Sequence, residues 1–307
     1  MDFEIAGISF YYIISWFFIY SFLGWVWESV YVSVKKKKLV NRGFINGPLC
    51  TIYGLGAVAV YLILKPFDEN LLILYVGGVV TATVLEYITG WLMEKIFHTR
   101  WWDYSSKKYN LHGYICLGSS VAWGFFTLLL FYVLQPFVSW ITDQYPVHAG
   151  RIVVAVVSAL YLADFSSSAA AAFGLSKAFG KAEDLLEELS LYLQNSKLYA
   201  TKEEIRDKLE SGKIYPAVQG AKERYEVRKQ EFLRRFETLA VQSGLPDTES
   251  YLKKRQELEA RLDEFGKKYL DMKQKQNRIK KRMVSAYPEL KSHFRRYREK
   301  QQKKQKK

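Results

Sequence analysis

Long apolar stretches and long charged stretches divide the chain into two parts of opposite character. Through the first 174 residues, apolar and aromatic side chains continue with few charged interruptions. A helix needs roughly 20 apolar residues to cross the hydrocarbon core of a bilayer. The pattern therefore predicts five transmembrane helices, the second of them short, over residues 8–34, 48–64, 71–97, 113–137 and 152–174.

The charge is as uneven as the hydropathy. The whole chain has a formal net charge of +14, yet its first 174 residues hold 11 Lys and Arg against 10 Asp and Glu, which leaves 34 bases and 21 acids for the rest. An apolar front and a charged, helix-forming back predict an all-α protein. We expect a transmembrane domain over 1–174, a helical coiled-coil region over 175–288 and a basic disordered tail over 289–307.

The bases in the connections between the predicted spans set the orientation. Lys35–Lys38 and Arg42 lie in the first connection, and Lys95, Arg100, Lys107 and Lys108 lie at the third, whereas the second and fourth have few bases. Loops rich in Lys and Arg stay on the cytoplasmic side. The sequence thus predicts an outside N-terminus and a cytoplasmic C-terminal tail.

Five identities recur at a fixed offset of 66 positions. They lie at the end of the first span and after it, and again at the end of the third span and after it. This spacing suggests a duplicated two-helix unit over about 20–54 and 86–124, as internal repeats are common in transport folds. Chance, or interface chemistry common to both places, would give the same matches. The matching residues are Gly24, Trp25, Glu28, Gly47 and Cys50 against Gly90, Trp91, Glu94, Gly113 and Cys116.

Two acids lie inside predicted spans, Glu86 in the third and Asp164 in the fifth. An ionisable group within a bilayer costs at least a few kcal/mol, so it usually faces the bundle interior or a wet cavity. One interpretation makes the two acids a cation or proton site, in which two close carboxyls share a proton or hold a cation. The alternative is that each binds neighbouring polar side chains and holds helices together.

A second group of candidates lies near the predicted cytoplasmic interface and comprises Glu28, Arg42, Trp91, Glu94 and Asp103. Acids at this depth can reach water or a base, and tryptophans anchor helix ends at headgroup level. The motif therefore has a functional and a purely structural interpretation, and both stay open.

The sequence gives little support for catalysis, metal binding or nucleotide binding. Glu94, His98, Asp103 and His112 could ligate a metal, but their spacing is not diagnostic. The stretch from Gly174 to Ala182 is similar to a phosphate loop, but its glycines are one residue too far apart and Ala182 stands where Ser or Thr would hold magnesium. We expect no enzyme activity and no cofactor.

The charged part predicts long helices. Thr201–Glu204 is a capping-box start and Ser243–Asp247 a break between two helices. Beyond the break, apolar positions alternate by four and three, as in a heptad seam with one polar core position. An intramolecular antiparallel hairpin and an intermolecular coiled coil both fit. The seam residues are Leu258, Leu262, Phe265, Tyr269, Met272, Gln276, Ile279 and Met283.

Beyond Pro288 the chain carries nine bases and one acid from Lys291 onward. A run of this kind is typical of a solvated extension. Near a membrane it could bind anionic lipid at about 1 kcal/mol per base. No nucleic-acid recognition fold accompanies it, so we expect no specific nucleic-acid partner.

Several strings in the apolar part are unusual enough to indicate a family: Phe22–Glu28, Asn41–Cys50 followed by Ile52–Gly54, Thr89–Lys95, Arg100–Ser105 and Ile115–Leu117. They resemble the bacterial membrane proteins named type-IV ABC-transporter permeases, over about Tyr20 to Trp123. Thr51 stands where the family pattern has a proline. The resemblance implies a permease subunit in a bacterial plasma membrane, with lipid around it, any ATPase on a separate chain and a possible homo-oligomer. It supplies no substrate and no catalytic residue. The alternative is a membrane-embedded scaffold or regulatory protein that acts through its tail.

Overall fold

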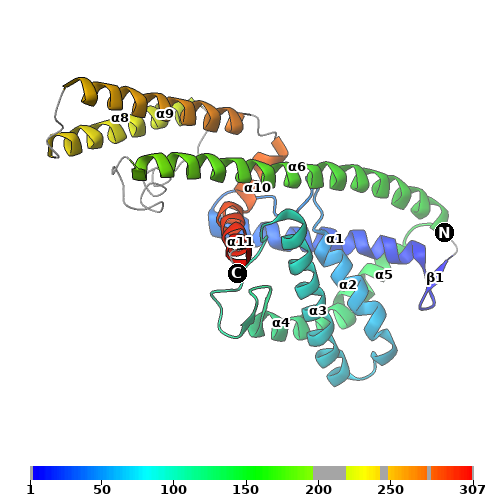
Figure 1. Ribbon diagram of the computed structural model, residues 1–307. Coiled ribbons are helices and arrows are strands. Elements are labelled where there is room, and N and C mark those ends of the chain that lie inside the picture. Colours follow the sequence, from blue (N-terminus) through cyan, green and yellow to red (C-terminus); the bar gives the residue numbers. More distant parts are fainter. Residues whose placement is uncertain (1–2, 196–218, 243–247, 275–277, 306–307) are drawn as a thin grey trace. The chain divides into compact units, whose positions relative to one another are not determined.

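The computed structural model describes residues 3–195, 219–242, 248–274 and 278–305, and it is helical through most of them (Figure 1). The chain divides into two compact units. The first comprises Met1–Ser176 together with Arg278–Lys307, and the second comprises Lys177–Asn277. Each unit is described separately.

A small hairpin precedes the first helix. Strands β1 (Glu4–Ile5) and β2 (Ile8–Ser9) pair antiparallel through a turn in which Ala6 and Gly7 have φ of 52° and 72°. Two consecutive positive φ values are typical of the tight turns that match strand twist. Strands of two residues carry no readable hydrophobic period, so the sequence did not predict this hairpin.

Four helices of the first unit are long and apolar enough to cross a membrane, which makes the chain a membrane protein by length and composition. Helix α2 (Thr51–Leu64), followed by the short η1 (Lys65–Phe67), corresponds to the second expected span and is shorter than the other four. Its 14 residues rise about 21 Å. The four long stretches are α1 (Phe10–Lys36), α3 (Leu71–Phe97), the segment Leu117–Asp143, and α6 (Val147–Asn195).

The third of these stretches contains a π-helical turn. Helix α4 (Leu117–Leu129) passes through η2 (Leu130–Leu134) into α5 (Gln135–Asp143), which has Pro136 in its first turn. Proline has no backbone N–H to complete the helical ladder, and a wider turn is one way a helix adjusts.

The apolar helices of the first unit pair in chain order, α1 with α2 and α3 with α4. Gly54 lies so close to Phe17 and Ser21 that a Cβ there would be 2.1 Å from the Ser21 Oγ, and a Cβ on Gly78 would be 2.2 Å from the Thr127 Oγ1. Small residues of this kind let helix backbones approach closely in lipid.

The two helix pairs agree with the 66-residue offset only in part. Helix α2 begins at Thr51 and α4 at Leu117, each after a cysteine N-cap. The loops before them differ. Residues 98–116 form strands β3 (Asn110–Leu111) and β4 (Ile115–Cys116), whereas in residues 37–50, all of them described, no strand forms. Duplication therefore stays a prediction.

The second unit is built from the end of α6, α8 (Gln219–Gln242) and α9 (Thr248–Gln274). Lys229 pairs with Asp263, and Glu237 pairs with Arg255, which shows that α8 and α9 run antiparallel within one chain. The hairpin alternative is thus present, while intermolecular coiled-coil assembly stays a prediction. The core residues are Leu186, Leu189, Leu193, Phe232, Leu233, Phe236, Leu258, Leu262 and Phe265.

The structure corrects two expectations at the C-terminus. The predicted seam does not continue through Ile279 and Met283, which belong to α10 (Arg278–Ala286) in the first unit. Residues 290–305 are not a disordered tail but helix α11. The reason is that Leu290 and Phe294, four residues apart, are buried at 1% and 7% exposure and give the basic run an apolar face.

Three sequence predictions fall where the structure gives no description. The capping box at Thr201–Glu204, the break at Ser243–Asp247 and the polar seam position Gln276 lie outside the described residues. The flanking helices end and begin at Gln242 and Thr248.

Candidate functional site

Most of the predicted site residues lie in two loops of the first unit or on the helices next to them. We call residues 37–50, between α1 and α2, the first motif loop, and residues 98–116, between α3 and α4, the second motif loop. Arg42 lies in the first and Asp103 in the second, while Glu28 and Glu94 lie on the helices that lead into them.

Asp164, on α6, binds the first motif loop. Its Oδ1 accepts hydrogen bonds from the backbone N of Asn46 at 3.1 Å and the side-chain Nδ2 of Asn46 at 2.8 Å. Its Oδ2 accepts from the backbone N of Gly47 at 2.7 Å, and the Ser168 Oγ lies 3.3 Å from Oδ1. A carboxylate only accepts hydrogen bonds, and this one is surrounded by donors. Asp164 therefore anchors the loop.

Glu86, on α3, has the same relation to the second motif loop and α4. It is 7% exposed, and its Oε1 accepts from the Tyr104 hydroxyl at 3.1 Å. Its Oε2 accepts from the Trp123 Nε1 at 3.0 Å and the Ser119 Oγ at 3.4 Å. All three partners donate, so a buried carboxylate replaces its hydration shell with protein groups.

The two acids therefore have separate sets of partners. Asp164 holds Asn46 and Gly47, whereas Glu86 holds Tyr104 and two residues of α4. The shared proton or cation considered from the sequence requires the two carboxyls to face each other, and these contacts give no such arrangement. What sequence reasoning missed is that each acid faces a loop rather than another acid.

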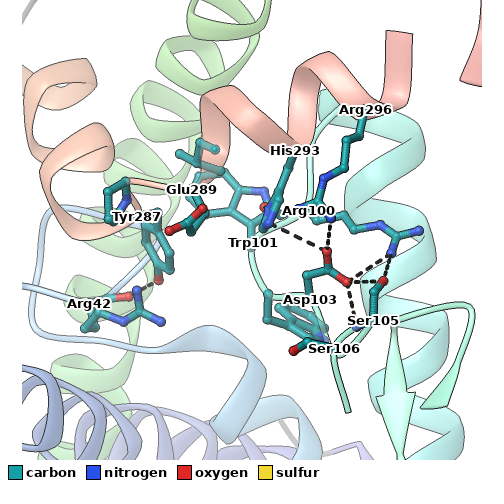
Figure 2. Close-up of a pocket in the computed structure, with 13 residues that line it drawn as sticks. Arg42, Arg100, Trp101, Asp103, Ser105, Ser106, Tyr287, Glu289, His293 and Arg296 are labelled. Atoms are coloured by element: carbon teal, nitrogen blue, oxygen red, sulfur yellow. Dashed lines mark hydrogen bonds and ion pairs between the residues drawn. The ribbon is translucent and has the colours of Figure 1, made fainter. Parts of the chain in front are cut away.

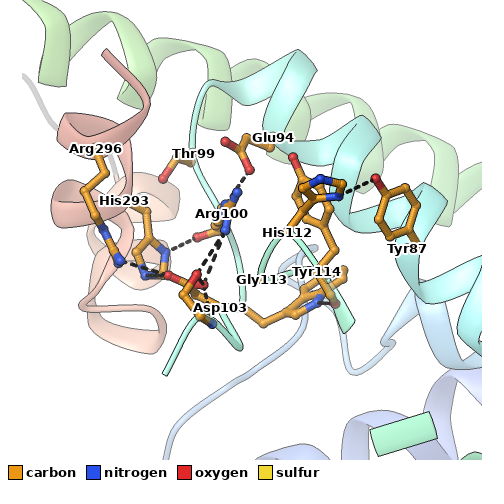
Figure 3. Close-up of polar contacts among 12 residues, drawn as sticks. Tyr87, Glu94, Thr99, Arg100, Asp103, His112, Gly113, Tyr114, His293 and Arg296 are labelled. Carbon is orange, nitrogen blue, oxygen red and sulfur yellow. Dashed lines mark hydrogen bonds and ion pairs between the residues drawn. The ribbon is translucent and has the colours of Figure 1, made fainter. Parts of the chain in front are cut away.

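Arg100 is the centre of a charged network in the second motif loop (Figure 3). Its Nε pairs with the Glu94 carboxylate, and its Nη1 lies 3.3 Å from the Asp103 Oδ1. The guanidinium also lies over the Tyr114 ring, 4.7 Å from its centroid. Charges buried in this way are stable only when they are paired and hydrogen-bonded.

Asp103 connects this network to helix α11. Its Oδ1 accepts from the backbone N of Ser105 at 2.9 Å, and its Oδ2 lies 3.0 Å from the Arg296 Nη1 and 3.8 Å from the His293 Nε2. Burial alone would raise the pKa of the Asp103 carboxyl, but the Ser105 donors together with Arg100 and Arg296 outweigh it and lower the pKa.

In the first motif loop, Glu28 and Arg42 form the corresponding polar group. The Tyr53 hydroxyl donates to the Glu28 Oε1 at 2.7 Å, and the Arg42 Nε lies 3.6 Å from the Glu28 Oε2. The Arg42 guanidinium lies 4.1 Å from the centroid of the Tyr287 ring, and its Nη1 donates to the carbonyl of Ala286 at 2.9 Å. The C-terminal helices thus contact both motif loops.

Trp91 does not join these networks through its ring. It is 44% exposed, with the Lys95 Nζ 4.9 Å from the ring centroid. This placement suits the interfacial anchoring expected of tryptophan. Within the described ranges, His, Cys, Asp and Glu nowhere form a group of three that could hold a metal ion. Cys50 and Cys116 are buried and unpaired with each other.

A pocket of about 400 Å³ lies between the second motif loop and the start of α11 (Figure 2). Neither Glu86 nor Asp164 lines it. Its lining is mixed, with aromatic and apolar side chains beside basic and acidic groups that mostly bind one another. Its charged and aromatic lining residues are Arg42, Arg100, Trp101, Trp102, Asp103, Tyr287, Glu289, His293 and Arg296.

Sequence reasoning missed His293 and Arg296 because it interpreted the basic C-terminus as a solvated extension. It missed Arg282 and Tyr287 because it placed them in the coiled-coil region over 175–288. The signal that could have found them is the apolar and aromatic spacing inside the basic run, at Leu290, Phe294 and Tyr297 among others. An apolar face on an otherwise polar helix indicates that something covers that face.

Comparison with known proteins gives one family and no individual relative. The family model described as "Putative ABC-transporter type IV" matches residues 15–169, about half of the chain. No curated protein and no solved structure matches. The matched range includes both motif loops and Asp164 but ends before the second unit and the C-terminal helices.

Proposed function

The chain belongs to the ABC-transporter type IV family, and we propose that it is a membrane-embedded scaffold subunit that holds a cytoplasmic helical module at the membrane. The observation that supports this role is the use made of its polar residues. Asp164 and Glu86 hold the two motif loops, and Arg42 and Asp103 bind the C-terminal helices. The charged side chains that could have carried catalysis or transport thus serve to join parts of the chain.

The proposal includes the topology that the loop charges predict. The chain crosses a bacterial plasma membrane five times, with α2 as a short span, an outside N-terminus and both motif loops in the cytoplasm. The loops and the charged second unit then lie on the same side, where a separate ATPase chain of a transporter would be found. The protein has no catalytic role of its own and needs no cofactor.

A permease subunit is the second candidate. The family description favours it, and so does the position of Glu86, a carboxyl at 7% exposure inside an apolar helix. Intramembrane acids often mark ion or substrate pathways. The two candidates differ in one physical respect, because a pathway must admit water to the acids and a scaffold need not.

Thiol labelling distinguishes the candidates. In the full chain with Cys50 and Cys116 replaced by alanine, single cysteines at Ser119 and Ser168 lie beside Glu86 and Asp164. A scaffold predicts that a small membrane-impermeant thiol reagent labels neither from either side of membrane vesicles. A cysteine at Ser106, which is exposed in the second motif loop, is the positive control. Labelling at both Ser119→Cys and Ser168→Cys would overturn the scaffold and support the permease.

A further inference from the structure

A segment of the C-terminal helices contacts both motif loops through specific hydrogen bonds, ion pairs and ring contacts. We call residues 278–297, which form α10 and the first half of α11, the arm. The arm lies more than 100 positions beyond the end of the family match at residue 169, yet it binds the loops inside that match. The family's motif residues therefore have an occupant that the family pattern does not include.

Arg282 donates hydrogen bonds to the backbone of the first motif loop. Its Nη1 donates to the carbonyl of Gly43 at 2.6 Å, its Nη2 to the carbonyl of Phe44 at 2.7 Å and its Nε to the Asn46 Oδ1 at 3.1 Å. The rigid planar fork of arginine suits such a set of acceptors, and lysine would not reproduce it. Asp164 also binds this loop, through Asn46 and Gly47. The loop is thus held by both a guanidinium and a carboxylate.

Tyr287 is the aromatic anchor of the arm. Its ring lies under the Arg42 guanidinium and meets the Trp101 ring edge-on, with centroids 4.9 Å apart, and its hydroxyl donates to the carbonyl of Arg42 (Figure 2). One side chain therefore touches both motif loops. Tyrosine, tryptophan and arginine packed together at the centre of a contact are typical of the residues that dominate binding energy.

The second motif loop holds the start of α11. The Thr99 Oγ1 donates to the carbonyl of Leu290 at 2.8 Å. The His293 Nδ1 lies 2.7 Å from the carbonyl oxygen of Arg100 (Figure 3). Arg296 pairs with Asp103 although its own side chain is 51% exposed, and the Tyr297 ring stacks on His98. Leu290 and Phe294 are buried, whereas the contacts around them are largely polar and the Arg296 end is exposed. A buried apolar centre with a polar, exposed rim is the arrangement of interfaces between separate segments.

We propose that the two motif loops form a binding surface for a basic, aromatic helical segment, and that the arm is its built-in, releasable ligand. The inference deepens the proposed scaffold role and rests on it, since the bound arm is what ties the far end of the second unit's chain to the membrane part. Release would free Asp103 and the Gly43–Asn46 backbone for another segment with the same chemistry.

The test separates the arm from the full chain after folding. A protease site replaces residues 275–277, between α9 and α10, in the complete protein purified in neutral detergent. After cleavage, the C-terminal fragment should stay bound through size exclusion at low salt. A fluorescent synthetic peptide of residues 278–305 should then exchange into the complex, and unlabelled peptide should compete with it.

Two peptide variants test whether recognition is specific. Arg282→Ala and Tyr287→Ala should each weaken competition on the order of 30-fold or more, as expected for residues at the centre of a contact. Lys281→Ala removes a neighbouring exposed base of α10 and should compete as well as the unchanged peptide. This pair distinguishes recognition from attraction between net charges.

Three results would overturn the inference. In the first, the cleaved fragment separates at once and does not rebind. In the second, the fragment stays bound and does not exchange with the labelled peptide. In the third, the Arg282→Ala and Lys281→Ala peptides compete equally well. None of these results bears on the thiol labelling beside Glu86 and Asp164. Failure of the arm and failure of the scaffold role are therefore distinguishable.

Discussion

Each motif loop is held by one carboxylate from an apolar helix, but the hydrogen-bond donors differ between the two loops. Asp164 binds the first mainly through backbone N–H groups, those of Asn46 and Gly47, together with the Asn46 side chain. Glu86 binds the second only through side chains, the Tyr104 hydroxyl and side chains of α4. Backbone donors are present whatever the loop sequence, while side-chain donors depend on particular residues. The comparison shows that an acid inside an apolar helix can be retained to fix a loop.

The difference in burial between the two acids also has a consequence. Glu86 is buried, while Asp164 is half-buried beside its loop. An unsatisfied polar group costs more when water cannot reach it. We therefore expect changes at Glu86 to be more damaging than changes at Asp164.

The largest expected effect is an all-or-none difference in cysteine labelling between the two sides of the membrane. In a background without native cysteines, single cysteines at Lys38 and Lys107 place one label in each motif loop, and a cysteine at Glu69 lies between α2 and α3. Because bases collect on the cytoplasmic side, an impermeant reagent should label Glu69→Cys in intact cells and the other two only after lysis. Labelling of Glu69→Cys and Lys107→Cys from the same side would contradict the five-span topology.

The next effect is the loss of the buried carboxylate. Glu86→Gln places an NH₂ group against the Tyr104, Ser119 and Trp123 donors, so at least one buried donor loses its acceptor. We expect a loss of about 2–3 kcal/mol in the free energy of unfolding, measured as a lower thermal midpoint in detergent. Hydrogen exchange should rise in the second motif loop. Equal exchange increases in both loops would contradict separate anchoring.

Asp164→Asn should have the smaller effect of the two. One amide oxygen can accept from Asn46 or from Gly47, but the amide NH₂ then faces an N–H donor. The expected loss is about 1–2 kcal/mol because the site is half-buried. Exchange should rise at Asn46 and Gly47 and stay unchanged at Tyr104. An unchanged thermal midpoint would show that the Asp164 contacts do not stabilise the loop.

The smallest effect is an acid dependence of arm binding through Asp103. Its pKa is lowered in the folded protein, so the ionised carboxylate stabilises the fold above the ordinary pKa, and this stabilisation is lost as pH falls through the lowered value. The comparison is made with Asp103→Asn in the cleaved complex, which keeps every other group of the contact unchanged. The unchanged chain should lose fragment more steeply below about pH 4. Identical pH profiles would exclude Asp103 as the cause.

The sequence by itself determined the elements that depend on local pattern. The length of the apolar stretches was enough to predict the long helices α1 and α3 and the membrane character of the first unit. The spacing of apolar residues was enough to indicate that Leu258, Leu262 and Phe265 lie on one buried face. The family could also be predicted, because its motif strings are contiguous in the chain. These properties require no knowledge of what lies opposite each residue.

Only the tertiary structure decided the partners of the polar groups. Asp164 and Asn46 are 118 positions apart, and Arg282 and Gly43 are 239 apart. A carboxylate or guanidinium is satisfied by any suitable donor or acceptor within reach, so its identity does not specify its partner. The basic C-terminus was misinterpreted for the same reason. Its composition is that of a solvated extension, and only the surface formed by the two motif loops makes its few apolar and aromatic residues sufficient to fold and dock it.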